Sequence, residues 1–404
     1  MKEQLTVEHF GPLLKVKVDF KRVTVFIGPT GGGKSTLAKL AAMFRDKSSF
    51  LFAKHLGNLT SSFGLATYSD DTSRIEWKAH QGRIIFTNGK WFVDYLDTVE
   101  SEREKVMLLI SEINKEAALL NSQLEAKADA STYEPIVASI KDKRDTMEQY
   151  VTKSLAPNRP HYLPAERLLL AVLGETWPDL IGARSSLPAT LLSFAKDFLQ
   201  ARKEVESLDL PGVGVSYEFA DDRDRIRLPN GRQVLLTEAA SGVQSVAPLL
   251  VLLEYLSRST DQAQSFIIEE PELNLYPTAQ RELVNALVAK CTKGKNDLTI
   301  TTHSPYVLSA LNLALYADKV ATLFPHQRAK VAKLIPEEYW LKADEFSAYH
   351  VAAGKARSIF DSATGLLSES QLDEVSGDFA DLFDRLTDLR VPAKKASVKA
   401  APRK

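Results

Sequence analysis

The sequence predicts an α/β protein in which a mixed sheet is flanked by helices, with a helical hairpin inserted between its two halves. Two observations lead to this fold class. Segments with strand character alternate with helical segments on both sides of the middle of the 404-residue chain, and strands interleaved with helices favour a largely parallel sheet covered on both faces. Between these halves lies a charged, glycine-poor stretch whose apolar residues recur with helical spacing.

Composition and charge favour an ordinary soluble globular chain, with 44% hydrophobic and 25% charged residues. The formal net charge of −1 gives no global field to hold nucleic acid, so nucleic-acid binding would need a local basic patch. The single cysteine, Cys291, excludes a disulfide framework and suits a reducing compartment. The N-terminus has no apolar signal segment, and the longest apolar run, near residues 246–253, is too short to span a bilayer. We therefore expect cytoplasmic localisation and no membrane partner.

The first part of the chain is expected to consist mainly of strands. Residues 4–27 contain three runs with alternating or β-branched character, "LTVEHF", "LLKVKVDF" and "VTVFIG". A glycine-rich loop follows, and then a helix over about residues 35–44. We expect further short strands between residues 50 and 95, with Asn88-Gly89 as a hairpin turn.

A change of character at about residue 94 marks the helical insertion, which continues to about residue 153. The segment "ADASTYEP" is expected to interrupt it, so that a second helical run spans about residues 136–153. Two interpretations stay open: a hairpin packed on its own domain, or a protruding coiled coil that contacts a partner or another subunit. The first run has apolar residues spaced alternately by four and three positions, as in a heptad seam: Val106, Ile110, Ile113, Ala117, Leu120 and Leu124.

Strand and helix signals alternate again between about residues 160 and 390. The expected strands are "HYLPAER", "GVSYEF", "RIRL", "SFIIEE" and "DLTITTHS", with helices near 186–207 and from Ser241 onward. The last residues, 391–404, are rich in Ala, Pro, Lys and Arg without periodicity and are expected to form a disordered basic tail. A solubilising role and a weak nucleic-acid contact both stay open for this tail.

The stretch "GPTGGGKS" at residues 28–35 matches the G-x-x-x-x-G-K-[ST] pattern of a P-loop NTPase. Glycines let backbone N–H groups surround phosphate oxygens, and the following helix directs its positive end at the anion. In this pattern the lysine contacts the β- and γ-phosphates and the serine ligates Mg²⁺, so ATP and Mg²⁺ are the expected cofactors. The expected ATP-binding residues are Gly28, Pro29, Thr30, Gly31, Gly32, Gly33, Lys34, Ser35 and Thr36.

Two later strands end in residues suited to act on a triphosphate. The first ends in Glu269 and Glu270, and the carboxyl ends of parallel strands form the ligand-binding edge of such a sheet. Adjacent carboxylates repel a triphosphate unless a metal neutralises them, so we expect Glu269 and Ser35 to hold Mg²⁺. Glu270 is then expected to orient or deprotonate the attacking water. The next strand ends in His303, which we expect to reach the γ-phosphate and to act with Glu270 and Lys34 as a catalytic residue.

Ser241 and Gln244 have the spacing of a capping box at the start of an apolar helix. In that motif the two side chains satisfy free N–H groups at the helix end. The same helix end would also be an anion site.

With these motifs in order, the sequence resembles the ABC-type ATPases of the SMC, RecF and OLD group over about residues 3–310. Ser241-Gly242-Val243-Gln244 is similar to part of the ABC signature, Glu270 to the Walker B glutamate and His303 to the switch histidine. Residues 270–277 correspond to the D-loop region, and the helical insertion falls where this group inserts coiled coils. The resemblance implies a P-loop NTPase with a two-lobed nucleotide-binding domain. It divides the chain into an N-terminal lobe with Walker A (1–93), a helical or coiled-coil hairpin (94–155), a C-terminal lobe (156–390) and the tail (391–404).

The resemblance also implies self-association. In this group two copies sandwich two ATP molecules, each bound by the phosphate loop of one copy and the signature of the other. Ser241, Gly242 and Gln244 would then contact ATP in trans, in an ATP-dependent homodimer or higher oligomer.

Three positions depart from the group's pattern. Glu269 stands where most ABC proteins have Asp, although OLD-like members share "EEPE". Tyr276 occupies the usual D-loop Asp position, which puts a cross-subunit contact there in doubt. No Q-loop glutamine is evident; "YLPAER" at residues 162–167 resembles a segment of small bacterial defence-type ATPases and is its candidate counterpart.

Three functions stay open, and none includes a nuclease within this chain. A Toprim nuclease of the OLD type would need a further acidic strand and an Asp-x-Asp strand, whereas Asp378, Asp381 and Asp384 have helical spacing and indicate a solvated helix face. The first function is the sensor or regulatory ATPase of a bacterial antiphage defence system of the retron, Septu or PARIS type, which controls a separate effector such as a nuclease or toxin. The second is a RecF- or SMC-like DNA-repair clamp, which the near-neutral charge does not favour. The third is a scaffold that binds ATP without turnover, which Glu270 and His303 do not favour. We predict the first.

Overall fold

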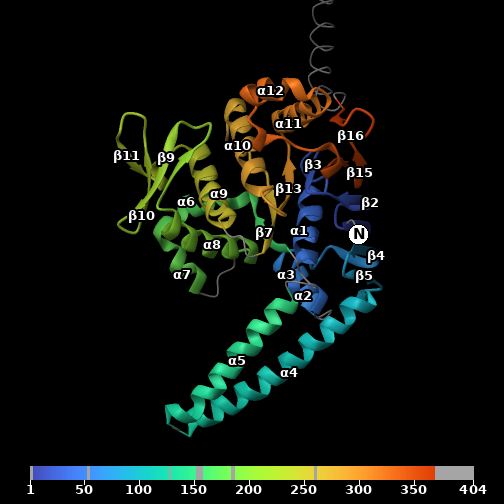
Figure 1. The fold of residues 1–404 in the computed structure, drawn as a ribbon, viewed down its shortest axis with the longest axis vertical. Coiled ribbons are helices and arrows are strands. Elements are labelled where there is room, and N and C mark those ends of the chain that lie inside the picture. Colours follow the sequence, from blue (N-terminus) through green and yellow to red (C-terminus); the bar gives the residue numbers. More distant parts are fainter. Residues whose placement is uncertain are drawn as a thin grey trace, which may run out of the picture.

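The fold is centred on one large mixed sheet (Figure 1). The computed structural model describes residues 3–51, 55–126, 129–151, 158–182, 187–258 and 262–368. The predicted tail and Asp378, Asp381 and Asp384 lie outside these residues. The strands of the large sheet are β1 (Glu3–Phe10), β2 (Leu13–Phe20), β3 (Val23–Ile27), β4 (Ser69–Ala79), β5 (Gly82–Thr87), β6 (Lys90–Tyr95), β7 (Asn158–Leu163), β12 (Ala263–Glu269), β13 (Asp297–Thr302), β14 (Phe346–Ala352) and β15 (Lys355–Ser358).

The 11 strands are arranged in the order β6-β5-β4-β1-β2-β15-β14-β3-β13-β12-β7. Strands β14, β3, β13, β12 and β7 are mutually parallel, whereas β6, β5, β4, β1 and β2 form an antiparallel meander. Strand β15 joins the halves, because it pairs antiparallel with β14 and parallel with β2. The predicted mixed α/β sheet is therefore confirmed. Its parallel half places the carboxyl ends of β3, β13, β12 and β7 along one edge.

Helices cover both faces of the parallel half. The helices outside the insertion are α1 (Lys34–Arg45), α2 (Lys47–Leu51), α3 (His55–Ser62), α6 (Leu168–Leu173), α7 (Trp177–Gly182), α8 (Ala189–Val205), α9 (Ser241–Ser257), α10 (Pro277–Cys291), α11 (Pro305–Leu323) and α12 (Arg328–Leu334). Successive side chains of β12 face helices on opposite sides of the sheet. Ile267 packs against α1, whereas Phe266 and Ile268 point into the cluster formed by α8, α9, α10 and α11. The strand is buried on both faces, as expected for a parallel sheet in an α/β fold.

A second, smaller sheet lies beside the large one (Figure 1). It is antiparallel, in the order β11-β10-β9-β8. The predicted strands "GVSYEF" and "RIRL" belong to it rather than to the main sheet. The remaining short strands are β8 (Ser207–Leu210), β9 (Val215–Ala220), β10 (Arg223–Arg227), β11 (Gln233–Leu235), β16 (Phe360–Asp361) and β17 (Leu366–Leu367).

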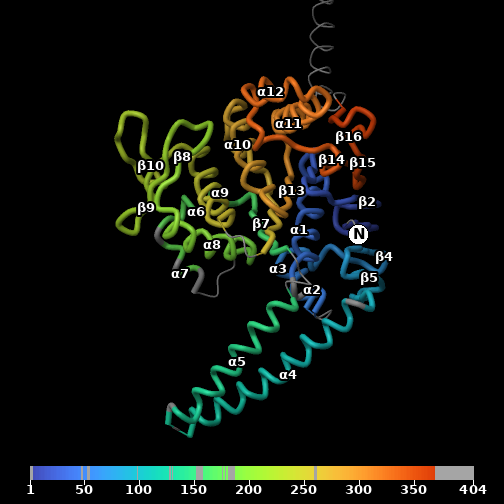
Figure 2. The backbone as a smooth tube through the Cα atoms, in the orientation of Figure 1, coloured from blue at the N-terminus to red at the C-terminus, as the bar shows by residue number. Residues whose placement is uncertain are grey.

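The helical insertion consists of α4 (Asp97–Glu125) and α5 (Ala130–Tyr150), which project together from the body (Figures 1 and 2). Val106 is buried at the base, in a cluster with Leu51, Val99 and Val151. The hairpin thus projects as the second interpretation requires, and its contact with a partner or another subunit stays a prediction. The predicted break was misplaced, since α5 already begins at Ala130 and Pro135 lies inside it. Packing along α4 holds these residues helical although proline removes one backbone hydrogen bond.

Residues 55–62 form the helix α3, where short strands were predicted, so this prediction is wrong. Leu56 and Thr60 are buried on one side of α3, which packs on α1. The Thr60 hydroxyl donates to the Leu56 carbonyl oxygen at 2.6 Å, so its polar group is satisfied within the helix. Tertiary packing thus overrides the local preference.

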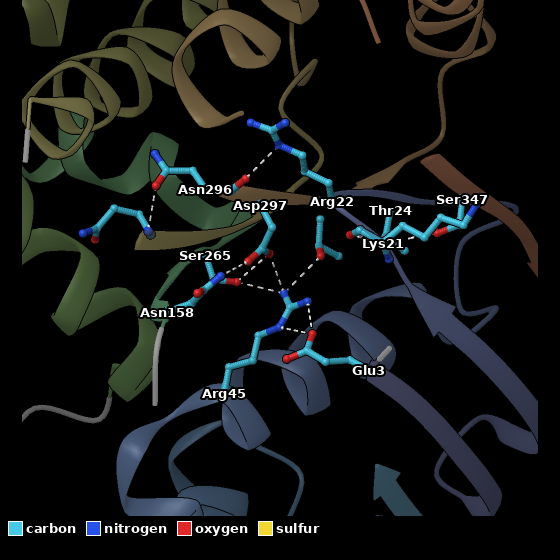
Figure 3. A network of polar contacts seen from close by, with 12 residues as sticks. Glu3, Lys21, Arg22, Thr24, Arg45, Asn158, Ser265, Asn296, Asp297 and Ser347 are labelled. Atoms are coloured by element: carbon cyan, nitrogen blue, oxygen red, sulfur yellow. Dashed lines mark hydrogen bonds and ion pairs between the residues drawn. The ribbon is translucent and has the colours of Figure 1, made fainter. Parts of the chain in front are cut away.

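A buried polar network attaches the end of α1 to the sheet (Figure 3). The Arg45 side chain, 5% exposed, pairs with Asp297 at 2.9 Å and with Glu3 at 2.6 Å. Asp297 also accepts hydrogen bonds from Ser265 and Asn158, each at 2.7 Å. These residues lie near the starts of β1, β7, β12 and β13, so the network braces the end of the sheet opposite the carboxyl edge.

No single helix within the described ranges combines the length and apolar composition that a membrane crossing needs. One bent pair, residues 305–323 with 325–334, meets that test on length and composition alone.

Candidate nucleotide site

The phosphate loop connects β3 to α1 at the carboxyl edge of the sheet. Pro29, Thr30 and Gly31 are exposed at its tip, whereas Gly32 and Gly33 are buried. Helix α1 begins at Lys34 with Gly33 as its N-cap, which has a φ of 105°. The first N–H groups of α1 have no carbonyl partner within the helix, so they present donors and the positive end of the helix dipole to the loop.

Two of the loop glycines are required by a neighbouring strand. A Cβ atom on Gly28 would lie 2.2 Å from the Val351 carbonyl oxygen, and one on Gly32 would lie 2.4 Å from the same atom. Gly28 also has a φ of 149°, which L-residues rarely adopt. The backbone of β14 therefore selects these glycines, a reason that the motif pattern alone does not contain.

The ammonium group of Lys34 is held over the loop. It donates to the carbonyl oxygens of Gly28 and Pro29 at 2.9 Å each, and it lies 3.4 Å from Nδ1 of His303. Burial lowers the pKa of Lys34, and the carboxylates of Glu270, Glu272 and Glu269 act in the opposite direction. A buried cation surrounded by carbonyl oxygens and backbone donors suits a phosphate, which would supply the missing negative charge.

Glu269 ends β12 and is 4% exposed. Burial raises its pKa; Tyr162, Lys39 and Ser35 lower it to a smaller extent. Its Oε1 atom and the Tyr162 hydroxyl are both buried without a partner in hydrogen-bonding geometry. An orphaned carboxylate oxygen near a serine hydroxyl is what a divalent cation would satisfy, so Ser35 and Glu269 fit Mg²⁺. The described residues contain no group of three or more His, Cys, Asp or Glu arranged to hold a metal, so the remaining ligands would be phosphate oxygens and water.

Glu270 and His303 meet across β12 and β13. Nε2 of His303 lies 2.7 Å from Oε1 of Glu270, while Nδ1 of the same ring faces Lys34. A protonated lysine can only donate, so Nδ1 accepts and Nε2 carries the proton that it donates to Glu270. Both side chains stay partly open to solvent, 32% for His303 and 22% for Glu270, as access to a bound nucleotide requires. The structure therefore brings the three predicted catalytic residues together.

Glu272 was not predicted as a site residue, and it holds the segment that carries His303. It is buried, and its Oε1 accepts hydrogen bonds from the Thr302 hydroxyl at 2.5 Å and from the His303 N–H at 3.0 Å. The second acid of "EEPE" thus lies beside the His303 ring, and the third accepts hydrogen bonds from the segment that carries His303. The only sequence signal was the position of Glu272 two residues after the acidic pair.

The predicted capping box at Ser241 is wrong. Ala240 is the N-cap of α9 and makes no side-chain cap bond, so Ser241 is already the first helical residue. The side-chain amide of Gln244 donates instead to the Thr237 carbonyl oxygen at 2.8 Å. The hydroxyl of Ser241 is therefore not used as a cap.

Gly242 is packed against the D-loop region. A Cβ atom there would lie 2.7 Å from the Asn274 carbonyl oxygen, so the start of α9 and the segment after Glu270 approach backbone to backbone. Among the described residues, no hydrogen bond or ion pair joins Ser241, Gly242 or Gln244 to the phosphate loop of the same chain. The structure thus unites the phosphate loop with Glu269, Glu270 and His303, and within the described residues it joins none of the predicted signature residues to that loop by a hydrogen bond or ion pair.

Arg167, the last residue of "YLPAER", is the residue beside this site whose contacts the sequence least revealed. It is 0% exposed and lies at the end of a short 3-10 turn, Ala165–Arg167, directly after β7. Its guanidinium donates to backbone carbonyl oxygens, including those of Glu269 and Glu270 at 2.7 Å and 2.5 Å. Burial lowers its pKa to about 10, against the effect of the neighbouring carboxylates, so it remains a cation at neutral pH.

The fold and the site together define a nucleotide-binding α/β protein with a P-loop at the carboxyl edge of its sheet. Residues 97–308, just over half of the chain, match the model of the AAA ATPase domain family. The chain belongs to this family. The matched range contains α9, the acidic end of β12 and His303, whereas the phosphate loop lies before it. No curated protein sequence matches the chain.

Several solved structures resemble this fold remotely. The SMC head domain from Thermotoga maritima is 11% identical, with 89% of this chain and 98% of that chain covered and a TM-score of 0.36. The SMC head domain with a coiled coil and joint from Pyrococcus yayanosii is 10% identical, with 93% and 99% covered and a TM-score of 0.41. An ATP-binding cassette in a dimeric post-hydrolysis state bound to ADP and Pi is 9% identical, with 88% and 97% covered and a TM-score of 0.31.

Proposed function

We propose that this chain is an ABC-type ATPase subunit that binds and hydrolyses ATP with Mg²⁺. One observation carries the proposal: Lys34 at the start of α1, His303 after β13 and Glu270 after β12 lie in one hydrogen-bonded row, with 3.4 Å between Lys34 and His303 and 2.7 Å between His303 and Glu270. A cation for the phosphates, a donor for the γ-phosphate and a carboxylate for water are the groups that phosphoryl transfer to water requires.

Each residue has one role in this proposal. The loop from Gly28 to Thr36 holds the phosphates through backbone donors, and Lys34 neutralises charge on the β- and γ-phosphates. Ser35 and Glu269 hold Mg²⁺, which when bound neutralises phosphate charge. Glu270 orients or deprotonates the attacking water, while His303 contacts the γ-phosphate from Nε2 or through a water molecule. Reaching the phosphate requires His303 to exchange its partner, and its partly exposed ring permits this.

We further propose that two copies close around ATP, with Ser241, Gly242 and Gln244 of one copy facing the phosphate loop of the other. Two features support this arrangement. Among the described residues, Ser241, Gly242 and Gln244 make no hydrogen bond or ion pair with their own phosphate loop, and the Ser241 hydroxyl is free of a capping role. A start of a helix with unused donors is an anion site, so the phosphates of ATP held by a second copy's phosphate loop are a fitting occupant.

For the cellular role we propose the regulatory ATPase of a bacterial antiphage defence system, located in the cytoplasm and acting on a separate effector. The near-zero net charge gives no general affinity for DNA, whereas the projecting hairpin carries exposed apolar side chains suited to a protein partner. These are Leu108, Leu119, Leu124 and Val137, each between 47% and 62% exposed. A DNA-repair clamp is the alternative, and it would require a basic surface formed on dimerisation.

Replacing Glu270 by Gln tests the catalytic proposal. The neutral amide keeps the shape but cannot accept a proton, so ATP turnover should fall by about 10²–10⁴-fold, while ATP binding and ATP-dependent assembly persist. Glu104→Gln, at an exposed position of α4, is the matched control and should leave turnover unchanged. Equal turnover in the Glu270→Gln variant and the wild type would contradict the assignment.

Mixing two inactive variants tests the shared site. Ser241→Arg should block hydrolysis and leave nucleotide binding by single subunits intact, and Lys34→Ala should abolish nucleotide binding. A mixed dimer contains one composite site with an intact loop and an intact signature, so the mixture should recover part of the activity. No recovery at any mixing ratio would argue against sites shared between copies.

The cellular role is tested by what co-purifies with the wild-type chain and by DNA titration. A nuclease or toxin that is retained by the wild type, but lost on removal of residues 101–148, would support a separate effector. Tight, ATP-dependent binding of the purified dimer to duplex DNA would favour the clamp.

A further inference from the structure

The guanidinium of Arg167 connects the signature helix with the catalytic end of β12. Its Nε donates to the carbonyl oxygen of Ser245 in α9 at 3.2 Å. Its Nη1 donates to the carbonyl oxygens of Pro164 at 3.1 Å and Glu269 at 2.7 Å. Its Nη2 donates to the carbonyl oxygen of Glu270 at 2.5 Å. One planar group therefore holds the backbone of three elements, and all its direct partners are carbonyl oxygens.

Burial of the Arg167 guanidinium costs solvation free energy, and what it provides in return is a rigid arrangement of its partners. A fully buried guanidinium loses its hydration, and none of the carboxylates in the described part of the chain forms an ion pair with it. The planar fork of donors holds several acceptors in fixed relative positions. Lysine, with a single point charge on a flexible stem, cannot reproduce this geometry.

The backbone at Glu270 is strained and held from both sides. Glu270 has a φ of 41°, a conformation that residues with a side chain seldom adopt and that persists only where the surrounding structure holds it. Its N–H donates to the Thr301 carbonyl oxygen at 2.8 Å, and its carbonyl oxygen accepts from Arg167. These two bonds direct the carboxylate toward His303, so a shift of the guanidinium would turn the carboxylate away.

We propose that Arg167 is a positioning residue that couples the position of α9 to the orientation of Glu270. This inference rests on the proposed function, in which the start of α9 contacts ATP held by the second copy. Ser245 lies one turn after Ser241, so displacement of the helix on ATP capture moves the Ser245 carbonyl oxygen, and through Arg167 it moves the peptide of Glu270. The carboxylate then becomes aligned for hydrolysis only after the second copy has closed on the nucleotide.

Arg167→Lys tests the coupling. It keeps the buried charge but loses the fork, so kcat should fall by about 10- to 100-fold, the cost of a small misplacement at a reacting centre, while KM for ATP stays within about twofold. Arg22→Lys is the matched control. Arg22 also donates to carbonyl oxygens, including Gly294 at 2.7 Å and Asn296 at 3.3 Å, but at the opposite end of the sheet. It should keep wild-type kcat.

Hydrogen–deuterium exchange provides a measurement that a merely structural role would not change. In the Glu270→Gln background, ATP and Mg²⁺ should protect peptides covering 241–246 and 268–272 together. With Arg167→Lys added, the first should still gain protection and the second should not. Arg167→Gln, which is neutral and avoids burial of an unpaired charge, serves if the lysine variant does not fold, and the same pattern is expected.

The two proposals fail in distinguishable ways. Wild-type kcat in the folded Arg167→Lys variant, or continued joint protection of both peptides, would overturn the positioning role and leave the ATPase assignment intact. Undiminished turnover in Glu270→Gln would overturn the proposed function itself.

Discussion

Arg45→Met should destabilise the fold strongly without touching the nucleotide site. The Arg45 side chain is 5% exposed and pairs with Asp297 and Glu3 at the end of α1 far from the phosphate loop. Methionine is similar in length and apolar, so the change removes the cation and its hydrogen bonds and leaves little cavity. The carboxylate of Asp297 then remains buried without its counter-charge.

The expected loss of unfolding free energy depends on the hydrogen bonds that Asp297 keeps after Arg45 is replaced. Breaking one partner of a buried pair costs about 3–5 kcal/mol. Asp297 keeps the hydroxyl of Ser265 and the amide of Asn158, each at 2.7 Å, so we expect a loss near the lower end, about 3 kcal/mol. Asp297→Asn in the same chain should recover part of it, because no carboxylate is then stranded; the double variant should be more stable than additivity predicts by about 1–3 kcal/mol.

The loss of unfolding free energy in Arg45→Met should depend on pH, and the pKa of Asp297 determines the direction. Burial raises the pKa of Asp297, and Arg45 opposes that shift, so removing Arg45 raises this pKa further above the ordinary value of 3.8. The folded variant then binds more protons than the unfolded chain above pH 3.8, and its stability falls as pH rises through that window. At acidic pH the variant and the wild type should therefore lie closer together.

Urea unfolding followed by tryptophan fluorescence measures these changes, since Trp77 lies beside Arg45 with 6.0 Å between the guanidinium carbon and the ring centroid. Arg328→Met is the control: Arg328 pairs with Glu337 at an exposed position, and solvent screening leaves an exposed ion pair with little effect on stability. A loss below about 1 kcal/mol for Arg45→Met, or strictly additive effects with Asp297→Asn, would refute the reasoning.

Three further predictions concern the site and its surroundings. Burial lowers the pKa of His161 to about 4 from 6.5, so the folded state resists protonation. As pH falls from 6.5 to 4, the wild type should therefore lose about 3 kcal/mol of unfolding free energy relative to His161→Gln. Parallel pH profiles of the two proteins in urea unfolding would contradict this. Gly28→Ala, whose Cβ would lie 2.2 Å from the Val351 carbonyl oxygen, should weaken ATP binding measured by calorimetry, whereas Gly57→Ala, with open space around its Cβ, should not. Glu272→Met removes the acceptor for Thr302 and His303 and should lower kcat by about tenfold or more in a steady-state ATPase assay, with unchanged kcat as the contrary result.

Features formed by neighbouring residues could be predicted from the sequence. The strand, loop and helix around Lys34, the Asn88-Gly89 turn and the acidic end of β12 depend on residues close together in the chain, so periodicity and turn chemistry were sufficient. The prediction failed where contacts with distant residues decide the conformation. Packing on α1 made residues 55–62 helical, and the α9 boundary fell at Ala240 instead of Ser241.

The contacts of Arg167 show why part of the site could not be predicted. Its partners Ser245, Glu269 and Glu270 lie 78, 102 and 103 residues away in the sequence. They are also backbone carbonyl oxygens, which every residue possesses. No residue type at those positions could therefore signal the contact.

By itself the sequence determined which chemical groups this protein has for acting on a nucleotide: a glycine loop with Lys34 and Ser35, the acids Glu269 and Glu270, and His303. The tertiary structure decided that these groups form one site, because β3, β13 and β12 are adjacent parallel strands whose carboxyl ends share an edge. Lys34 and His303 are 269 residues apart in the chain and 3.4 Å apart in space. Pairing between distant strands depends on the burial of both sheet faces, which no local segment of the sequence encodes.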